Sequence, residues 1–119
     1  GILKNNTIRV GNLSTARDFI DVRDGVKAMK LLTEKGQPGI PVNICTGKAY
    51  KISEVLDMLI DISKVEINVV QDNQLFRAGD EPLLLGDNER ISKLGFKPEY
   101  TLYQTLEEVF NDWMNRINK

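Results

Sequence analysis

Apolar residues recur at intervals of three or four positions in three long stretches of the chain, and this spacing predicts three amphipathic α-helices. The stretches are about Val22–Glu34, about Ser53–Ser63 and Leu102–Ile117. The last is the most regular, and the residues Thr101-x-x-Gln104 at its start fit a capping box. We expect the apolar stripe of this helix to pack in the core; it includes Phe110, Trp113, Met114 and Ile117.

Short polar signals predict where the helices begin and end. Asp21 and Ser53 are suited to cap the N-termini of the first two. Gly36 follows the first helix, and we expect it to take the left-handed conformation of a glycine at a helix C-terminus. A further brief helix is predicted to start at Asp87 or Asn88 and to end at Gly95.

Short segments that alternate or are rich in β-formers lie between the helices and predict strands. They are Thr7–Val10, Phe19–Val22, Val42–Cys45, Val65–Val70 and Leu83–Leu85. Residues 71–82 are polar and irregular. The order of strands and helices argues for an α/β domain in which helices cover a small sheet. A chain of 119 residues is long enough for one such domain with one sizeable core.

The composition excludes several classes of chemistry. The chain has 16 Lys and Arg against 17 Asp and Glu, no His and one Cys. This balance gives no electrostatic reason to expect nucleic acid or an anionic membrane as partner. The absence of His excludes Ser–His–Asp triads and His-containing zinc sites, and one Cys cannot build a cysteine metal cluster or an internal disulfide. We therefore expect no metal site and a reducing, cytoplasmic location.

Two arginines in charged segments are candidates for binding an anionic ligand. Arg17 begins the sequence RDFIDVRD, and Arg77 lies in the polar segment three residues before Asp80. The planar donor fork of a guanidinium matches two phosphate oxygens, and a nearby carboxylate can accept from ribose hydroxyls. The alternative is a pair of surface arginines held in ion pairs by their neighbours Asp18 and Asp80.

The common nucleotide-binding and catalytic motifs are missing from this sequence. Gly47-Lys48 lacks the spacing of a phosphate-binding loop, and no G-x-G-x-x-G occurs. If this chain, which has no His, performs acid–base chemistry, a carboxylate, Tyr or Lys must therefore carry it.

Three segments, in order, resemble the C-terminal part of extended short-chain dehydrogenase/reductases that act on nucleotide sugars. They are VGNLSTARDFIDVRDGVKAM (10–29), PVNICTGKAYKISEVLDML (41–59) and FRAGDEPLLLGDNERISKLGFKPEY (76–100). Gly11–Leu13 and Leu84–Asp87 favour the GDP-mannose branch. That branch contains GDP-mannose 4,6-dehydratase and GDP-4-keto-6-deoxy-mannose reductase, and of the two we favour the dehydratase.

The resemblance implies that residues 1–119 form the substrate-binding C-terminal part of a longer Rossmann-type enzyme. The NAD(P)-binding domain and the Tyr-x-x-x-Lys pair of that family lie upstream of the part present here. We therefore expect this chain to bind no cofactor and to be inactive alone, whereas the full-length enzyme uses NAD or NADP. The alternatives are a reductase of GDP-6-deoxy-mannose, a nucleotide-sugar epimerase, a stand-alone nucleotide-binding module and a purely structural domain.

The resemblance also assigns six residues to a site for a GDP-mannose-like nucleotide sugar. Arg17 and Arg77 match positions that contact the diphosphate, Asp80 a position near the ribose, and Val10, Gly11 and Asn12 a strand end near the base.

The resemblance carries an expectation about assembly as well. In the family the segment matching Val42–Cys45 joins the sheet of the cofactor domain. We expect an edge strand here that could pair with a second chain, and a homo-oligomeric full-length enzyme.

Overall fold

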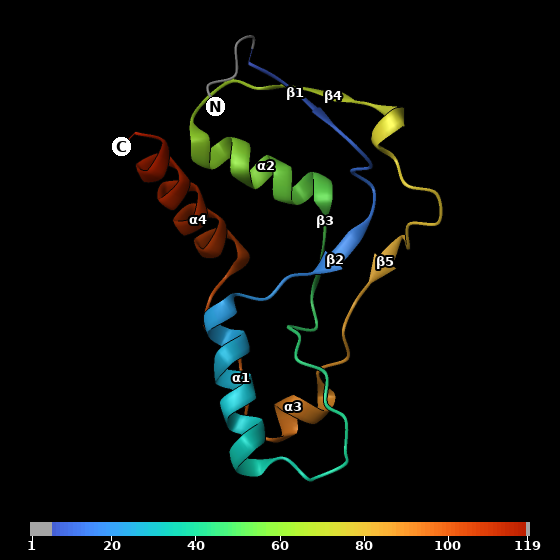
Figure 1. Cartoon of the computed structure of the whole chain (residues 1–119), viewed down its shortest axis with the longest axis vertical. Helices are drawn as coiled ribbons and strands as arrows, with labels where there is room; N and C mark the ends of the chain where they lie inside the picture. Colours follow the sequence, from blue (N-terminus) through green and yellow to red (C-terminus); the bar gives the residue numbers. More distant parts are fainter. Residues whose placement is uncertain (1–5, 119) are drawn as a thin grey trace.

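The computed structural model of the chain describes residues 6–118, which form four α-helices, five short strands and one 3₁₀ turn (Figure 1). The strands are β1 (Thr7–Val10), β2 (Ala16–Asp18), β3 (Ala49–Lys51), β4 (Asn68–Gln71) and β5 (Leu83–Leu84). The helices are α1 (Val22–Lys35), α2 (Ile52–Ser63), α3 (Glu89–Lys93) and α4 (Leu102–Ile117), and the 3₁₀ turn is η1 (Asn73–Leu75). The α/β class with three longer helices is confirmed.

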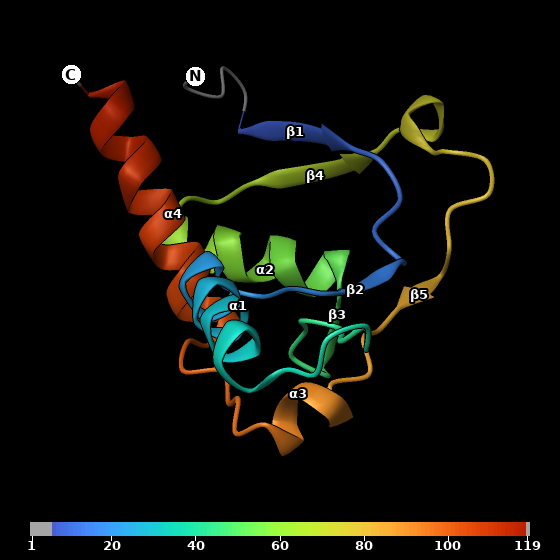
Figure 2. The same ribbon diagram turned by 60° about the horizontal axis from the view of Figure 1, so that its bottom comes forward.

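The strands form two small sheets. β1 and β4 pair in parallel as a two-stranded ribbon, from Thr7 opposite Asn68 to Val10 opposite Gln71. In the second sheet β2 is central, antiparallel to β3 and parallel to β5. In both ribbon views α2 lies between the β1–β4 ribbon and α1, and α4 runs beside α2 (Figure 2).

The first helix begins as predicted but ends differently. The Asp21 carboxylate accepts from the Arg23 N–H at 2.8 Å and caps α1. Gly36 is extended, with φ −71° and ψ 153°, and is not left-handed. Glycine is required there for another reason: a Cβ would approach the Leu32 carbonyl oxygen to 2.5 Å.

The predicted N-cap of α2 was wrong, whereas the predicted start of α4 was right. α2 begins at Ile52, so Ser53 lies inside the first turn and Lys51 occupies the cap position. At α4 the predicted capping box is confirmed, because Gln104 N–H donates to Thr101 Oγ1 and Thr101 N–H donates to Gln104 Oε1.

The strand predictions were less accurate. β1 is confirmed, but β2 ends at Asp18, so Phe19–Val22 is not a strand. Val42–Cys45 forms no strand within residues 6–118, although Val42 and Ile44 pack against the core. The expected edge strand is therefore not formed, because no neighbouring strand lies alongside to accept its backbone hydrogen bonds.

The core is small, and the prediction of one sizeable core was wrong. Ala28, Ile91 and Phe96 form its buried apolar cluster. Of the α4 stripe that was expected inside, Phe110 is half-buried and the other residues are exposed: 58% of Trp113 and 50% of Ile117 are accessible. The total accessible surface is 8889 Å², whereas a compact monomer of this mass exposes roughly 6,500 Å².

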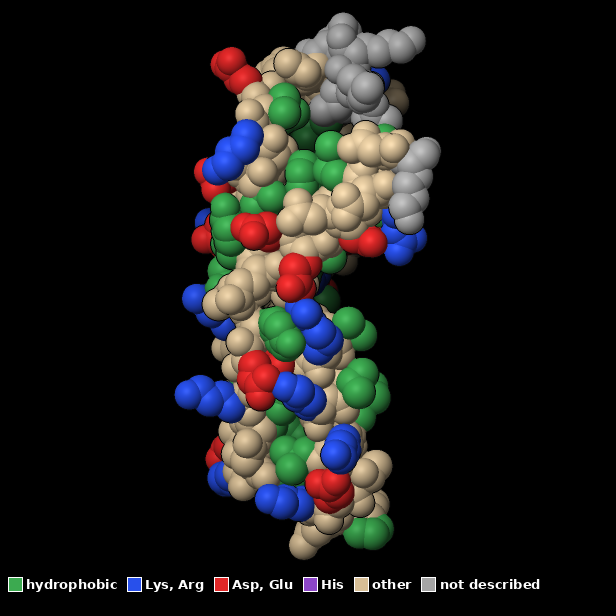
Figure 3. All heavy atoms as spheres, turned by 90° about the vertical axis from the view of Figure 1, so that its left-hand side faces the viewer, with side chains coloured by type: hydrophobic (Ala, Val, Ile, Leu, Met, Phe, Trp, Pro, Cys, Tyr) green, Lys and Arg blue, Asp and Glu red, His purple; other side chains and the backbone are tan. Residues whose placement is uncertain are grey.

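The overall shape agrees with this excess of surface. The radius of gyration is 17.3 Å, against about 13.5 Å for a compact domain of this length. Figure 3 shows apolar side chains reaching the surface between charged ones on the face carried by α1 and α4. Within the described part of the chain, no helix has the length and apolar character needed to cross a bilayer.

Candidate functional site

The two predicted segments around Gly11 and Arg77 are brought together where β1 ends. A Cβ on Gly11 would approach the Leu75 carbonyl oxygen to 2.9 Å, so the backbone after β1 packs directly against η1. Phe76 and Arg77 follow η1 immediately. Val10 and Gly11 therefore lie next to the start of the loop that carries Arg77, although more than 60 positions separate them in sequence.

Arg17 lies on β2, the central strand of the second sheet, and is joined to the same loop. Its Nη1 donates to the carbonyl oxygens of Ala16 and Glu81, both at 2.8 Å. Because Glu81 directly follows Asp80, this contact ties β2 to the loop of Arg77 and Asp80. The parallel pairing of Arg17 with Leu84 on β5 fixes the same arrangement.

The charges of the three predicted polar residues are not neutralised by close carboxylate or ammonium partners. Arg77 and Asp80 are exposed on either side of Gly79, which has a left-handed φ of 80°. Within residues 6–118, neither they nor Arg17 forms an ion pair. The sequence-based pairing of Arg77 with Asp80 was therefore wrong, and so was that of Arg17 with Asp18.

Asp18 is occupied elsewhere and acts as a scaffold for the site. Its carboxylate accepts from the backbone N–H and the hydroxyl of Thr46 and from the N–H of Gly47 at 2.9 Å. It also accepts from the Gly86 N–H at 3.4 Å, just after β5. These contacts hold the turn before β3 and the end of β5 against β2, which keeps Arg17 in place.

The structure adds two residues that the sequence did not reveal. The antiparallel register sets Tyr50 of β3 directly opposite Arg17, so their side chains share one face of the sheet. The Lys48 ammonium lies 4.9 Å from the centre of the Tyr50 ring, a cation–π distance. Contact with Tyr50 raises the pKa of Lys48, which keeps it charged. Lys48 and Tyr50 are two positions apart, and this spacing places their side chains on one face of a strand. The sequence does not show which other strand pairs with that strand.

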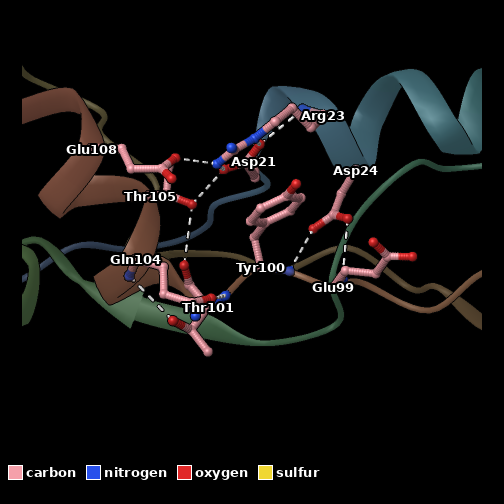
Figure 4. A network of polar contacts seen from close by, with 9 residues as sticks. All are labelled: Asp21, Arg23, Asp24, Glu99, Tyr100, Thr101, Gln104, Thr105 and Glu108. Atoms are coloured by element: carbon pink, nitrogen blue, oxygen red, sulfur yellow. Dashed lines mark hydrogen bonds and ion pairs between the residues drawn. The ribbon is translucent and has the colours of Figure 1, made fainter. Parts of the chain in front are cut away.

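A separate polar cluster joins α1 to α4 (Figure 4). Asp21 is buried and accepts from Arg23 and from the Thr105 hydroxyl at 2.7 Å. Arg23 also pairs with Glu108 and lies 3.7 Å from the centre of the Tyr100 ring. The hydrogen bond from Arg23 holds the pKa of Asp21 well below its usual value. Every group here has a partner inside the chain, so we interpret this cluster as structural.

Asp24 extends the same cluster toward the segment before α4 (Figure 4). It lies in the first turn of α1 and is fully buried. Its carboxylate accepts from the backbone N–H groups of Glu99 and Tyr100 at 3.0 and 3.2 Å. Asp24 therefore fixes the segment that leads into α4.

Comparison with known proteins gives one family match. The family model described as GDP-mannose 4,6 dehydratase matches residues 2–109. The chain is 35% identical over 118 residues to GDP-6-deoxy-D-mannose reductase of Pseudomonas aeruginosa, covering 98% of this chain and 39% of that protein. The chain thus spans about two fifths of the length of this relative.

Many solved structures share the fold, and two of them illustrate the match. The structure of RMD from Pseudomonas aeruginosa complexed with NADPH superposes with a TM-score of 0.88 at 35% identity, covering 95% of this chain and 37% of that one. UDP-N-acetylglucosamine 4-epimerase from Methanobrevibacter ruminantium M1, in complex with UDP-N-acetylmuramic acid, gives a TM-score of 0.78 at 28% identity. That match covers 92% of this chain and 34% of the epimerase. The matched region is the C-terminal portion of Rossmann-type enzymes.

Proposed function

Because this chain belongs to the GDP-mannose 4,6-dehydratase family, we propose that it binds the nucleotide-diphosphate half of a GDP-linked sugar. In this proposal residues 1–119 are the substrate-binding C-terminal part of a longer enzyme. The observation that carries it is the hydrogen bond from Arg17 to Glu81, which joins the first predicted arginine to the loop of the second.

Arg17 has the donors needed for a diphosphate. Its Nη1 is used by two backbone carbonyls, whereas Nε and Nη2 form no hydrogen bond within the described chain. A guanidinium has five N–H donors, so at least three remain for phosphate oxygens. The backbone contacts hold the group in one orientation before any ligand arrives, which lowers the entropy lost on binding.

The loop and the end of β1 supply the other contacts of the proposed site. Arg77 is a second cation for the diphosphate, and the exposed Asp80 accepts from the ribose hydroxyls. Asn12 follows β1, and its side-chain oxygen accepts from the N–H and the hydroxyl of Ser14. These bonds orient the Asn12 amide so that its NH₂ can donate to the base, next to Val10 and Gly11.

The hydride chemistry is assigned to the part of the enzyme outside this chain. The chain has neither a glycine-rich dinucleotide loop nor a Tyr-x-x-x-Lys pair. We propose that the full-length protein uses NADPH or NAD, since the related RMD structure is complexed with NADPH. Between the two GDP-sugar reactions, the identity to the reductase over nearly the whole chain supports reduction ahead of dehydration.

Binding of a UDP-sugar is the second candidate, favoured by the match to an epimerase in complex with UDP-N-acetylmuramic acid. Calorimetric titration of the full-length protein with GDP, UDP and GMP separates the two. We expect GDP to bind more tightly than UDP because of the base, and more tightly than GMP because of the second phosphate. Equal affinity for GDP and GMP would contradict a diphosphate site, and tighter UDP binding would favour the epimerase.

A further inference from the structure

Two connections cross side by side from the β1–β4 ribbon to the β2 sheet in both ribbon views (Figure 1 and Figure 2). One is the segment 11–15 between β1 and β2, and the other is the segment 76–82 between η1 and β5. They are joined at one end by the packing of Gly11 against Leu75, and at the other by the hydrogen bond that ties β2 to the loop of Arg77. A nucleotide held by the second connection therefore lies close to the first.

The first connection carries Asn12, and the orientation of its side-chain amide is fixed by its hydrogen-bond partners. The amide oxygen accepts from the backbone N–H of Ser14 at 2.9 Å and from the Ser14 hydroxyl at 2.6 Å. A backbone N–H can only donate, so the amide atom that faces it must be the oxygen. If the amide were turned over, its NH₂ group would meet that N–H, donor against donor. The NH₂ group is therefore the part of Asn12 that is left for a ligand.

The segment around Asn12 is held in place by the start of α2. The backbone N–H groups of Ile52 and Ser53 donate to the carbonyl oxygens of Thr15 and Leu13, at 2.9 and 3.0 Å. Asn12 is half-buried, and its Nδ2 forms no hydrogen bond within the described part of the chain. A half-buried donor of this kind gains from a ligand acceptor, whereas a second donor placed against it costs free energy.

We propose that Asn12 selects the nucleotide base, accepting bases that present a carbonyl oxygen and rejecting those that present an amino group. This inference rests on the proposed function, which places the base beside Asn12. The Asn12 NH₂ group donates to the O6 carbonyl of guanine. Adenine carries an amino group at the equivalent carbon, so two donors would meet there. Ser14 is the positioning residue that keeps the amide from turning over to relieve this conflict.

The selection concerns one edge of the base and not its size. Uracil presents the O4 carbonyl, whereas cytosine has an amino group at the same position. Asn12 therefore separates UDP from CDP in the same way as it separates GDP from ADP, and the inference covers both candidate ligands. Inosine diphosphate isolates the contact, because hypoxanthine keeps O6 and lacks the 2-amino group of guanine.

Calorimetric titration of the full-length protein with GDP, inosine diphosphate and ADP tests this selection. We expect inosine diphosphate to bind about as tightly as GDP, and ADP to bind more weakly by roughly tenfold or more. If UDP binds more tightly than GDP, the same comparison is made with UDP and CDP.

The decisive variant is Asn12→Asp. One carboxylate oxygen still accepts from Ser14, so the turn is kept, and the other presents an acceptor where the NH₂ group was. The added charge weakens binding of every diphosphate, but the ratio of GDP to ADP affinity should fall by roughly tenfold or more, because the amino group of adenine now meets an acceptor.

Asn73→Asp is the matched control, because it adds the same charge at an exposed position on η1. It should leave the ratio of GDP to ADP affinity unchanged. An unchanged ratio in Asn12→Asp, or equal affinity of the wild type for GDP and ADP, would overturn selection by Asn12 while leaving the diphosphate site intact. Failure of both GDP and UDP to bind to the wild type would overturn the proposed function, and the base selection with it.

Discussion

At the scale of single residues, the proposed site gives Arg17 a structural and a binding role in one side chain. One nitrogen holds the loop through Glu81, and the others remain open toward a ligand. Lysine keeps the charge but lacks the planar fork, so it cannot hold the loop and grip two oxygens together. We expect Arg17→Lys in the full-length enzyme to weaken GDP binding nearly as much as Arg17→Ala. Retention of wild-type affinity by the lysine variant would show that charge alone matters.

Tyr50 and Lys48 provide a second prediction at this scale. The Tyr50 ring, which lies opposite Arg17, supports the Lys48 ammonium. Tyr50→Ala removes this support and should weaken GDP binding several-fold, because a cation–π contact contributes about 0.5–1 kcal/mol at an exposed site. Tyr50→Phe keeps the ring and should lose less. Calorimetry of the two variants compares them directly, and equal losses would exclude the ring as the support.

Asp21 gives a prediction for pH. Its pKa in the folded protein is lowered, chiefly by the hydrogen bond from Arg23, relative to about 3.9 in the unfolded chain. The stabilisation is therefore present above the unfolded pKa and is lost as the pH falls toward the folded pKa. Asp21→Asn should reduce the free energy of unfolding by about 2 kcal/mol at neutral pH.

The measurement for Asp21 is urea unfolding of the full-length protein at neutral pH and at stepwise lower pH. The gap between wild type and the Asn variant should narrow below about pH 4. A gap that stays constant across this range would mean that the Asp21 charge contributes nothing.

At the scale of elements, Gly25 inside α1 and Gly36 at its C-cap form a matched pair. A Cβ on Gly36 would collide with the Leu32 carbonyl, whereas a Cβ on Gly25 meets nothing within 4 Å. Gly36→Ala should therefore destabilise by about 1–3 kcal/mol through a forced backbone shift. Gly25→Ala, in the helix interior, should stabilise by about 0.5–1 kcal/mol. Urea unfolding distinguishes the two, and the same sign for both would contradict the packing described at the helix end.

The elements also show what sequence reasoning could and could not reach. Local signals identified α1 and α4, because Asp21 and the Thr101–Gln104 box act within a few residues of the helix start. Strand positions depend on partners far along the chain, so Val42–Cys45 was predicted as a strand that has no neighbour here. Residue type alone made Arg17, Arg77 and Asp80 candidates, and the family resemblance added the end of the first strand. Pairing between distant strands explains why Tyr50 was missed.

At the scale of the whole molecule, the excess surface is the feature that composition could not predict. Apolar residues at helical spacing suggest a core, but they do not say which element covers them. On α1, Val22, Val26 and Met29 are exposed and form such an uncovered face. We propose that the remainder of a longer enzyme covers this face.

This interpretation predicts a difference between the isolated chain and the full-length protein. The 119-residue chain should bind a hydrophobic dye such as ANS strongly, while the full-length protein should bind little. The chain alone should also bind no NADPH and turn over no GDP-sugar. Fluorescence and activity assays on both proteins check this, and activity from the isolated chain would overturn the assignment of chemistry to the upstream part.

The central claim is that Arg17 and Arg77 hold one diphosphate, and calorimetric titration of GDP into the full-length protein tests it most directly. Arg17→Ala and Arg77→Ala should each weaken binding by roughly tenfold to a hundredfold, as expected for charge-assisted hydrogen bonds. The control Arg116→Ala, whose arginine pairs with Asp112 on α4, should bind as the wild type does. GDP affinity that is unchanged in both Arg17→Ala and Arg77→Ala would contradict the account.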